Sequence, residues 1–223
     1  MQNLDKLCRK LGYTFEQPEL LARALTHRSY GARNNERMEF LGDAILGYLI
    51  STALYNQFPD ASEGQLSRLR ASLVKGDTLA SIASELELGE YLNLGSGELK
   101  SGGHRRRSIL ADAFEAIIGA VYLDSGIDSA SELVQYFFTD KISRLDPRTL
   151  KKDPKTRLQE FLQARGDALP DYQVVATQGK AHEQHFKVEC RIEGLAEPVI
   201  GEGTSRRKAE QAAADLMLQT LTD

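Results

Sequence analysis

Residues 35–43 read NERMEFLGD and predict a helix with an acidic strip along one side. Residues three and four positions apart are neighbours on a helix, so Glu39 lies beside both Glu36 and Asp43. None of the residues at this spacing from Glu39 or Asp43 is basic. Like charges placed this way destabilise a helix by roughly 0.2 to 0.5 kcal/mol per pair. The strip is therefore either a solvated acidic face or part of a cation site.

A second acidic strip occurs in residues 108–121, which read SILADAFEAIIGAV. Asp112 and Glu115 share one face of the expected helix with serine, alanine and glycine, while the opposite face is apolar. The small residues beside these acids allow another helix to approach closely. If the two acidic strips face each other, four carboxylates converge, and such an oxygen-rich site suits a hard divalent cation such as Mg²⁺.

The composition is that of a globular protein, with 223 residues of which 41% are hydrophobic and 27% charged. A net charge of −4 lacks the basic excess of a typical nucleic-acid-binding protein, so any surface for a polyanion must be local. Cys8 and Cys190 form neither a metal-spaced pair nor a disulfide framework. Because we find no signal-peptide segment and no stretch of membrane-spanning length, we expect a cytoplasmic protein with no membrane partner.

The sequence pattern changes character in the last third of the chain. Helical periodicity recurs from residue 3 to about residue 145, and a glycine-rich stretch at 89–103 predicts one long loop within it. Asp153-Pro154 then predicts a helix start, alternating residues predict three strands, and Ser205 begins a closing helix. We therefore expect a multidomain protein: an all-α domain at 1–146, a linker at 147–152, and a small α+β domain of order α-β-β-β-α at 153–223.

Three cations occupy the first turn of the closing helix, at Arg206, Arg207 and Lys208. The helix macrodipole already makes this end positive, and it disfavours each added cation by a few tenths to about 1 kcal/mol. Helix N-termini bind phosphate, so these cations would build an anion site at a cost in stability. The alternative is a solvated basic turn that is partly paired with Glu202 or Glu210.

Taken together, these residues resemble bacterial ribonuclease III, whose signature helix is similar to residues 35–43. The combination is specific, although each acidic spacing taken singly would be a weak signal. The C-terminal region resembles a double-stranded RNA-binding domain, so the resemblance covers nearly the whole chain. Further similar stretches lie at residues 25–29, 63–70, 97–103 and 109–112.

The resemblance implies a metal-dependent nuclease site in the helical domain. Glu39, Asp112 and Glu115 match the metal-binding carboxylates of the family, and Asp43 and Glu115 are the expected catalytic residues. The implied cofactor is Mg²⁺, for which we expect Mn²⁺ to substitute.

Two further acids, Glu36 and Glu63, match secondary acidic positions at the cleft of the family. Their assignment competes with ordinary structural roles. Glu36 could instead form an ion pair with Arg33 or Arg37, and Glu63 lies in a turn-like segment.

The resemblance also implies an RNA-binding surface on the second domain. Domains of this type lay a basic turn across the phosphates of the narrow major groove, flanked by two minor-groove contacts. The family often has proline at the position of Ala181, in the loop that would make one of these contacts. By position, the expected RNA-binding residues are Thr156, Gln159, Gln163, His182, Arg206, Arg207 and Lys208.

The implied partners are double-stranded RNA and a second copy of the chain, with no small-molecule substrate. Similar enzymes are homodimers in which the signature helices of two chains pack together. Phe40 on this helix is therefore the expected dimer contact, and ordinary core packing of its ring is the alternative.

The implied activity is hydrolysis of phosphodiester bonds in double-stranded RNA by an endoribonuclease that uses Mg²⁺. A water activated on the metal would attack the phosphate, leaving 5′-phosphate and 3′-hydroxyl ends with short 3′ overhangs. The expected roles are processing of precursor rRNA and of other structured RNAs, including mRNA and tRNA precursors. Two alternatives stay open: an RNA-binding protein with a non-catalytic dimerisation domain, and an acid cluster that holds Ca²⁺ or Mg²⁺ for stability alone.

Overall fold

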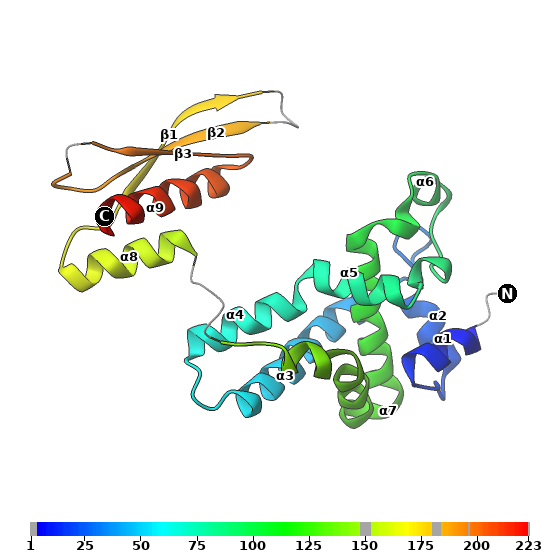
Figure 1. The fold of residues 1–223 in the computed structure, drawn as a ribbon. Helices are drawn as coiled ribbons and strands as arrows, with labels where there is room; N and C mark the ends of the chain where they lie inside the picture. Colours follow the sequence, from blue (N-terminus) through cyan, green and yellow to red (C-terminus); the bar gives the residue numbers. More distant parts are fainter. Residues whose placement is uncertain (1–3, 148–152, 180–183, 196, 223) are drawn as a thin grey trace. The chain divides into compact units, whose positions relative to one another are not determined.

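The protein divides into two compact units, residues 1–150 and residues 151–223, which we describe separately (Figure 1). The structure is a computed structural model and describes residues 4–147, 153–179, 184–195 and 197–222. Apart from Pro147, the predicted linker at 147–152 lies outside the described residues. We retain 1–146 and 153–223 as proposed domain boundaries.

The first unit is helical, as predicted. The glycine-rich stretch at 89–103 is not one long loop, because it holds a helix of five residues and parts of two 3-10 turns, which are too short to give a periodic signal. None of the helices in the described part of the chain combines the length and apolarity of a membrane span. The elements are α1 (Leu4–Leu11), α2 (Pro18–Ala24), α3 (Glu36–Gln57), α4 (Glu63–Val74), α5 (Gly76–Glu85), η1 (Leu88–Glu90), α6 (Ser96–Lys100), η2 (Gly103–Arg105) and α7 (Arg107–Ser143).

Helices α3 and α7 pack closely against each other, and two glycines make this possible. A Cβ atom at Gly42 would lie 1.8 Å from the carbonyl oxygen of Glu115, and one at Gly119 would lie 2.3 Å from that of Met38. No side chain fits in such a space, so the two helix backbones touch at these points. Because Gly42 is three residues from Glu39 and Gly119 is four from Glu115, this contact brings the two acidic strips together.

Helix α7 bends at Gly126, whose φ of 83° lies outside the helical region and favours glycine. Asp124, just before the bend, accepts a hydrogen bond of 2.7 Å from the Tyr13 hydroxyl. Its carboxylate also accepts bonds of 2.9 Å from the backbone N–H groups of Glu16 and Gln17. These contacts tie the bend to the segment that precedes α2.

The second unit has the predicted order of one helix, three strands and one helix, which confirms the fold class. Its elements are α8 (Pro154–Arg165), β1 (Asp171–Gln178), β2 (His185–Arg191), β3 (Val199–Gly203) and α9 (Arg206–Thr222). The strands form an antiparallel sheet of order β1-β2-β3, and α8 and α9 lie on the same side of it (Figure 1). The Asp153 side chain caps α8 by accepting from the Thr156 N–H, as the Asp-Pro pair predicts. The buried core of this unit includes Leu158, Leu162, Cys190, Ala213 and Met217.

Candidate active site and RNA-binding surface

Three carboxylates from the two acidic strips meet between α3 and α7. Glu39 on α3 and Asp112 and Glu115 on α7 each offer an oxygen atom, and these atoms all lie within 4.8 Å of one another. All three residues are half-buried. Carboxylate oxygens at this spacing can share one hard divalent cation, while a soft or nitrogen-preferring metal would favour thiolate or imidazole ligands.

The electrostatics of this cluster show that it carries unbalanced negative charge. Burial, followed by repulsion from Asp43 and Asp112, raises the pKa of Glu115 to about 8. Burial and repulsion from Asp112 also raise the pKa of Glu39 above its usual range. Bringing these acids together therefore costs free energy unless a proton or a cation neutralises them.

Asp43 lies on α3 one turn beyond Glu39, and its side chain is exposed. It stands outside the group of three converging carboxylates. Its charge nevertheless contributes to the raised pKa of Glu115, so it lies at the margin of the same site. The structure thus brings three of the four predicted carboxylates into one group and places the fourth beside them.

A polar pocket adjoins the cluster and holds both acids and bases. Glu36 lines it and pairs with Arg28 at 3.5 Å in the described structure, where the sequence suggested Arg33 or Arg37. Arg106 pairs there with Glu98 at 2.6 Å. Glu98 and Arg106 had no predicted role, because Glu98 lies in the five-residue helix α6 and Arg106 directly precedes α7, and so short a helix and its flanking turns give no periodic signal. The lining residues are His27, Arg28, Asn35, Glu36, Glu39, Glu98, Arg106, Ser108, Ile109 and Asp112.

Glu63 and Phe40 lie elsewhere on the first unit. The described residues that line the polar pocket do not include Glu63, which is the exposed first residue of α4 and accepts a bond of 2.7 Å from the Ser67 hydroxyl. The side chain of Phe40 on α3 is 79% exposed. The alternative that the Phe40 ring packs in the core of its own chain is therefore wrong.

The predicted RNA-binding residues lie at two helix surfaces of the second unit. Gln159 and Gln163 on α8 are exposed, while the Thr156 hydroxyl donates to Asp153 at 2.7 Å. His182 lies outside the described residues. Arg206, Arg207 and Lys208 form the exposed first turn of α9.

Each of the two units matches known proteins. The family model Ribonuclease-III-like matches residues 17–142, and the model Double-stranded RNA binding motif matches residues 154–221. Ribonuclease 3 of Shewanella sp. (strain W3-18-1) is 58% identical over 221 residues, which cover 99% of this chain and 98% of that protein. Ribonuclease 3 of Vibrio vulnificus (strain CMCP6) is 57% identical over 220 residues, again covering 99% and 98%.

Solved structures are similar to the first unit. The nuclease domain of ribonuclease III from Campylobacter jejuni has a TM-score of 0.62 at 41% identity and covers 66% of this chain and 100% of its own. A second structure of that domain, described for structural flexibility in a region involved in dimer formation, has a TM-score of 0.61 at 42% identity and covers 62% and 97%. With a full-length relative at 58% identity and matching models for both units, the chain belongs to the ribonuclease III family.

Proposed function

We propose that this endoribonuclease hydrolyses phosphodiester bonds in double-stranded RNA with Mg²⁺ held by Glu39, Asp112 and Glu115. The observation that carries the proposal is the convergence of three carboxylate oxygens within 4.8 Å, in a place where burial and mutual repulsion raise the pKa of Glu115 to about 8. A divalent cation offsets this repulsion, and an all-oxygen donor set is the one that Mg²⁺ prefers. Mn²⁺ accepts the same ligands and should substitute.

Each acid has a distinct part in the proposed reaction. When bound, Mg²⁺ supplies an activated water and neutralises charge that builds on the phosphate. With its pKa raised to about 8, Glu115 would hold a proton near neutral pH without the cation. It would release that proton to solvent where the cation binds, because a metal-binding carboxylate must be deprotonated. The carboxyl group of Asp43 is exposed at the margin of the cluster, so we assign it the role of accepting the proton of the attacking water.

The expected products follow from the geometry of the substrate. A strand held in an A-form duplex cannot easily align its own 2′-hydroxyl for attack, so an external water is the nucleophile. We propose that the water attacks phosphorus and that the P–O3′ bond breaks, so the 3′-oxygen leaves as the 3′-hydroxyl and the phosphate stays on the 5′ end. The proposed substrates are duplex regions of precursor rRNA and of mRNA and tRNA precursors, and we propose that the enzyme acts in the cytoplasm.

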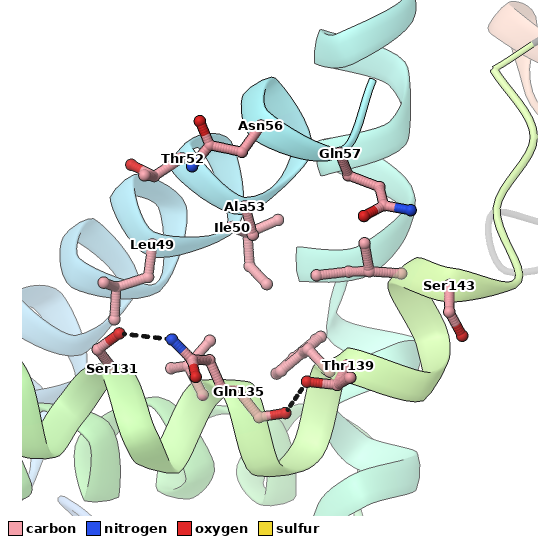
Figure 2. A pocket seen from close by; sticks show the side chains of 13 residues that line it. Leu49, Ile50, Thr52, Ala53, Asn56, Gln57, Ser131, Gln135, Thr139 and Ser143 are labelled. Carbon is pink, nitrogen blue, oxygen red and sulfur yellow. Dashed lines mark hydrogen bonds between the residues drawn. The ribbon is translucent and has the colours of Figure 1, made fainter. Parts of the chain in front are cut away.

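We further propose that two copies of the chain pair through α3. Phe40, Tyr48 and Tyr55 are 79%, 61% and 70% exposed along this helix, and a row of exposed aromatic rings is typical of an interface. The C-terminal half of α3 and the second half of α7 also enclose an apolar groove, seen in Figure 2, where Leu49 and Ile50 face the helix that carries Gln135.

Twofold symmetry relates these two features. In an isologous contact each surface meets the partner's copy of the same surface. We place the twofold axis perpendicular to α3 at its middle, which makes the two α3 helices antiparallel. Phe40, near the start of α3, then meets the groove at the far end of the partner's α3. Such a dimer holds two clusters of acids, which can cut both strands and leave short 3′ overhangs.

The test is incubation of labelled RNA duplex, the corresponding single strand and the matching DNA duplex with the protein, with and without Mg²⁺. We expect Mg²⁺-dependent cleavage of the RNA duplex alone, with 5′-phosphate ends. A duplex that is bound but left uncut in Mg²⁺ would instead favour the non-catalytic alternative. Cleavage in the presence of a chelator would exclude the proposed metal site.

A further inference from the structure

A glutamate follows the basic turn of α9 by one helical turn. Glu210 lies in the second turn of this helix, and its side chain is only 13% exposed. One carboxylate oxygen accepts from the Lys155 ammonium at 2.7 Å, and the other accepts from the Arg206 Nε at 2.9 Å. The hydrogen bond from Lys155 is the main cause that lowers the pKa of Glu210. The carboxylate is therefore a charged group that bridges two cations.

The bridge joins the start of α8 to the start of α9. Lys155 belongs to the first turn of α8, and its ammonium also lies 4.2 Å from the ring centroid of Tyr172 on β1. The Lys155 backbone N–H donates to the Gln211 side chain at 3.0 Å. Gln211 in turn donates to Asp153 at 2.8 Å. A connected polar network thus fixes the first turn of α8 against α9.

Glu210 carries an electrostatic cost at this position. The proposed RNA contacts lie on either side of it, at Thr156 and Gln159 on α8 and at the basic turn of α9. Phosphate contacts gain their affinity from positive charge, and Glu210 cancels one of the two charges that it bridges. Burying a bridged ion pair also gives little net stability, because desolvation offsets the attraction. What the bridge does supply is a fixed geometry between the two helices.

We propose that Glu210 is a positioning residue for duplex recognition, which holds α8 and α9 at the separation that double-stranded RNA requires. Duplex RNA is recognised through its shape, by contacts to two minor grooves and to the phosphates between them, so the spacing of the two helices decides selectivity. Single strands adapt their shape and do not need this spacing. The proposal rests on the proposed RNA-binding role of α8 and α9.

The test compares Glu210→Gln with Glu202→Gln in the full-length protein, with a chelator present so that RNA stays intact. Glu202 is a matched control, because it is an exposed glutamate of the same domain that pairs with a lysine, Lys187, at 2.7 Å. Both variants gain one unit of positive charge. Affinities for an RNA duplex and for its single strand are measured across a salt series.

We expect E210Q to bind the duplex about tenfold more weakly than E202Q does, a change of about 1.4 kcal/mol. Its affinity for the single strand should equal that of E202Q, and its salt slope on the duplex should not fall, because no phosphate contact is lost. The proposal is overturned if E210Q binds the duplex as tightly as E202Q, since Glu210 would then only weaken phosphate attraction.

Thermal unfolding would detect any misfolding of E210Q. A second variant, Lys155→Met, breaks the same bridge from its other side and so tests the proposal independently of E210Q. Met keeps the apolar stem of Lys155 and removes its charge. We expect K155M to weaken duplex binding without lowering the salt slope, and to add no further loss in the E210Q background. A lower slope, or a full additional loss in the double variant, would make Lys155 a phosphate contact and contradict the proposal.

Failure of the proposed RNA surface would look different. If replacing Arg207 and Lys208 by alanine left duplex affinity unchanged, α9 would not be the RNA contact at all. If that replacement weakened binding while E210Q did not, only the positioning role of Glu210 would be wrong.

Discussion

Glu115→Gln should stabilise the metal-free protein at alkaline pH while it abolishes cleavage. The variant keeps the shape of the side chain and removes the charge that the cluster repels. A pKa of about 8 in place of the ordinary 4.5 corresponds to about 5 kcal/mol if it is fully transmitted to folding. Glu115 is only half-buried, so solvent screens part of this repulsion, and we expect about 2 to 3 kcal/mol.

The direction of the pH dependence of stability depends on whether the folded or the unfolded state binds the proton of Glu115 more tightly. The folded state raises the pKa of Glu115, so it holds the proton more strongly than the unfolded chain does between about pH 4.5 and pH 8. The contribution of Glu115 to stability is therefore fully present below this window, falls as pH rises through it, and stays low above it. Wild type and E115Q should be equally stable near the acidic end and should differ most above the alkaline end.

The measurement is urea unfolding of wild type, E115Q and Glu132→Gln across this pH range, followed by far-UV circular dichroism in a chelator. Glu132 is an exposed acid on the same helix α7, so E132Q controls for the change in net charge. Adding Mg²⁺ above pH 8 should stabilise the wild type and leave E115Q unchanged. A stability difference between E115Q and wild type that does not depend on pH, or equal stabilisation of both by Mg²⁺, would refute the reasoning.

Three other changes test the remaining proposals. Phe40→Asp should convert a dimer into a monomer in sedimentation experiments, because it places a charge in the apolar groove; a dimeric F40D would rule out the α3 interface. Deleting residues 147–223 should leave a folded, dimeric nuclease unit that cuts weakly and mainly at low salt, and an unfolded or monomeric product would contradict the proposed boundary. Replacing Arg207 and Lys208 by alanine should weaken binding to all RNA duplexes alike and lower the salt slope by roughly 0.9 per lost contact if the B-DNA coefficient applies, with unchanged cut sites. Sequence-dependent losses would show that this turn does not simply clamp phosphates.

The periodicity of a helix explains how much of the active site the sequence could predict. Side chains three and four residues apart share a face whatever the rest of the fold does, so the two acidic strips follow from spacing alone. The small residues beside the acids indicated that another helix could approach closely. That α3 and α7 meet through Gly42 and Gly119 is a result of long-range packing, which the local spacing of residues does not determine.

Loops and side-chain bridges explain most of what the sequence left open. Glu98 and Arg106 line the polar pocket, yet they come from short helices and turns between residues 88 and 107 that have no periodic pattern. The ion-pair partner of Glu36 is Arg28, which follows α2 and comes close to Glu36 only in the folded chain. At Glu210, the sequence indicated a pair with the basic turn but not that its carboxylate is buried and shared with Lys155.

Both units break a local stability rule at the place where they are proposed to act. In the first unit the acids at α3 and α7 repel one another, and the free energy of that repulsion is available to a bound cation. A variant that relieves the repulsion therefore cannot keep the cation affinity, so E115Q must gain stability and lose metal binding together. In the second unit the cations at the start of α9 oppose the helix dipole, and phosphate relieves this cost in the same way. Glu210 reduces the repulsion between these cations and the helix dipole, because its carboxylate neutralises part of their charge. In the proposed role it also fixes where the remaining cations lie.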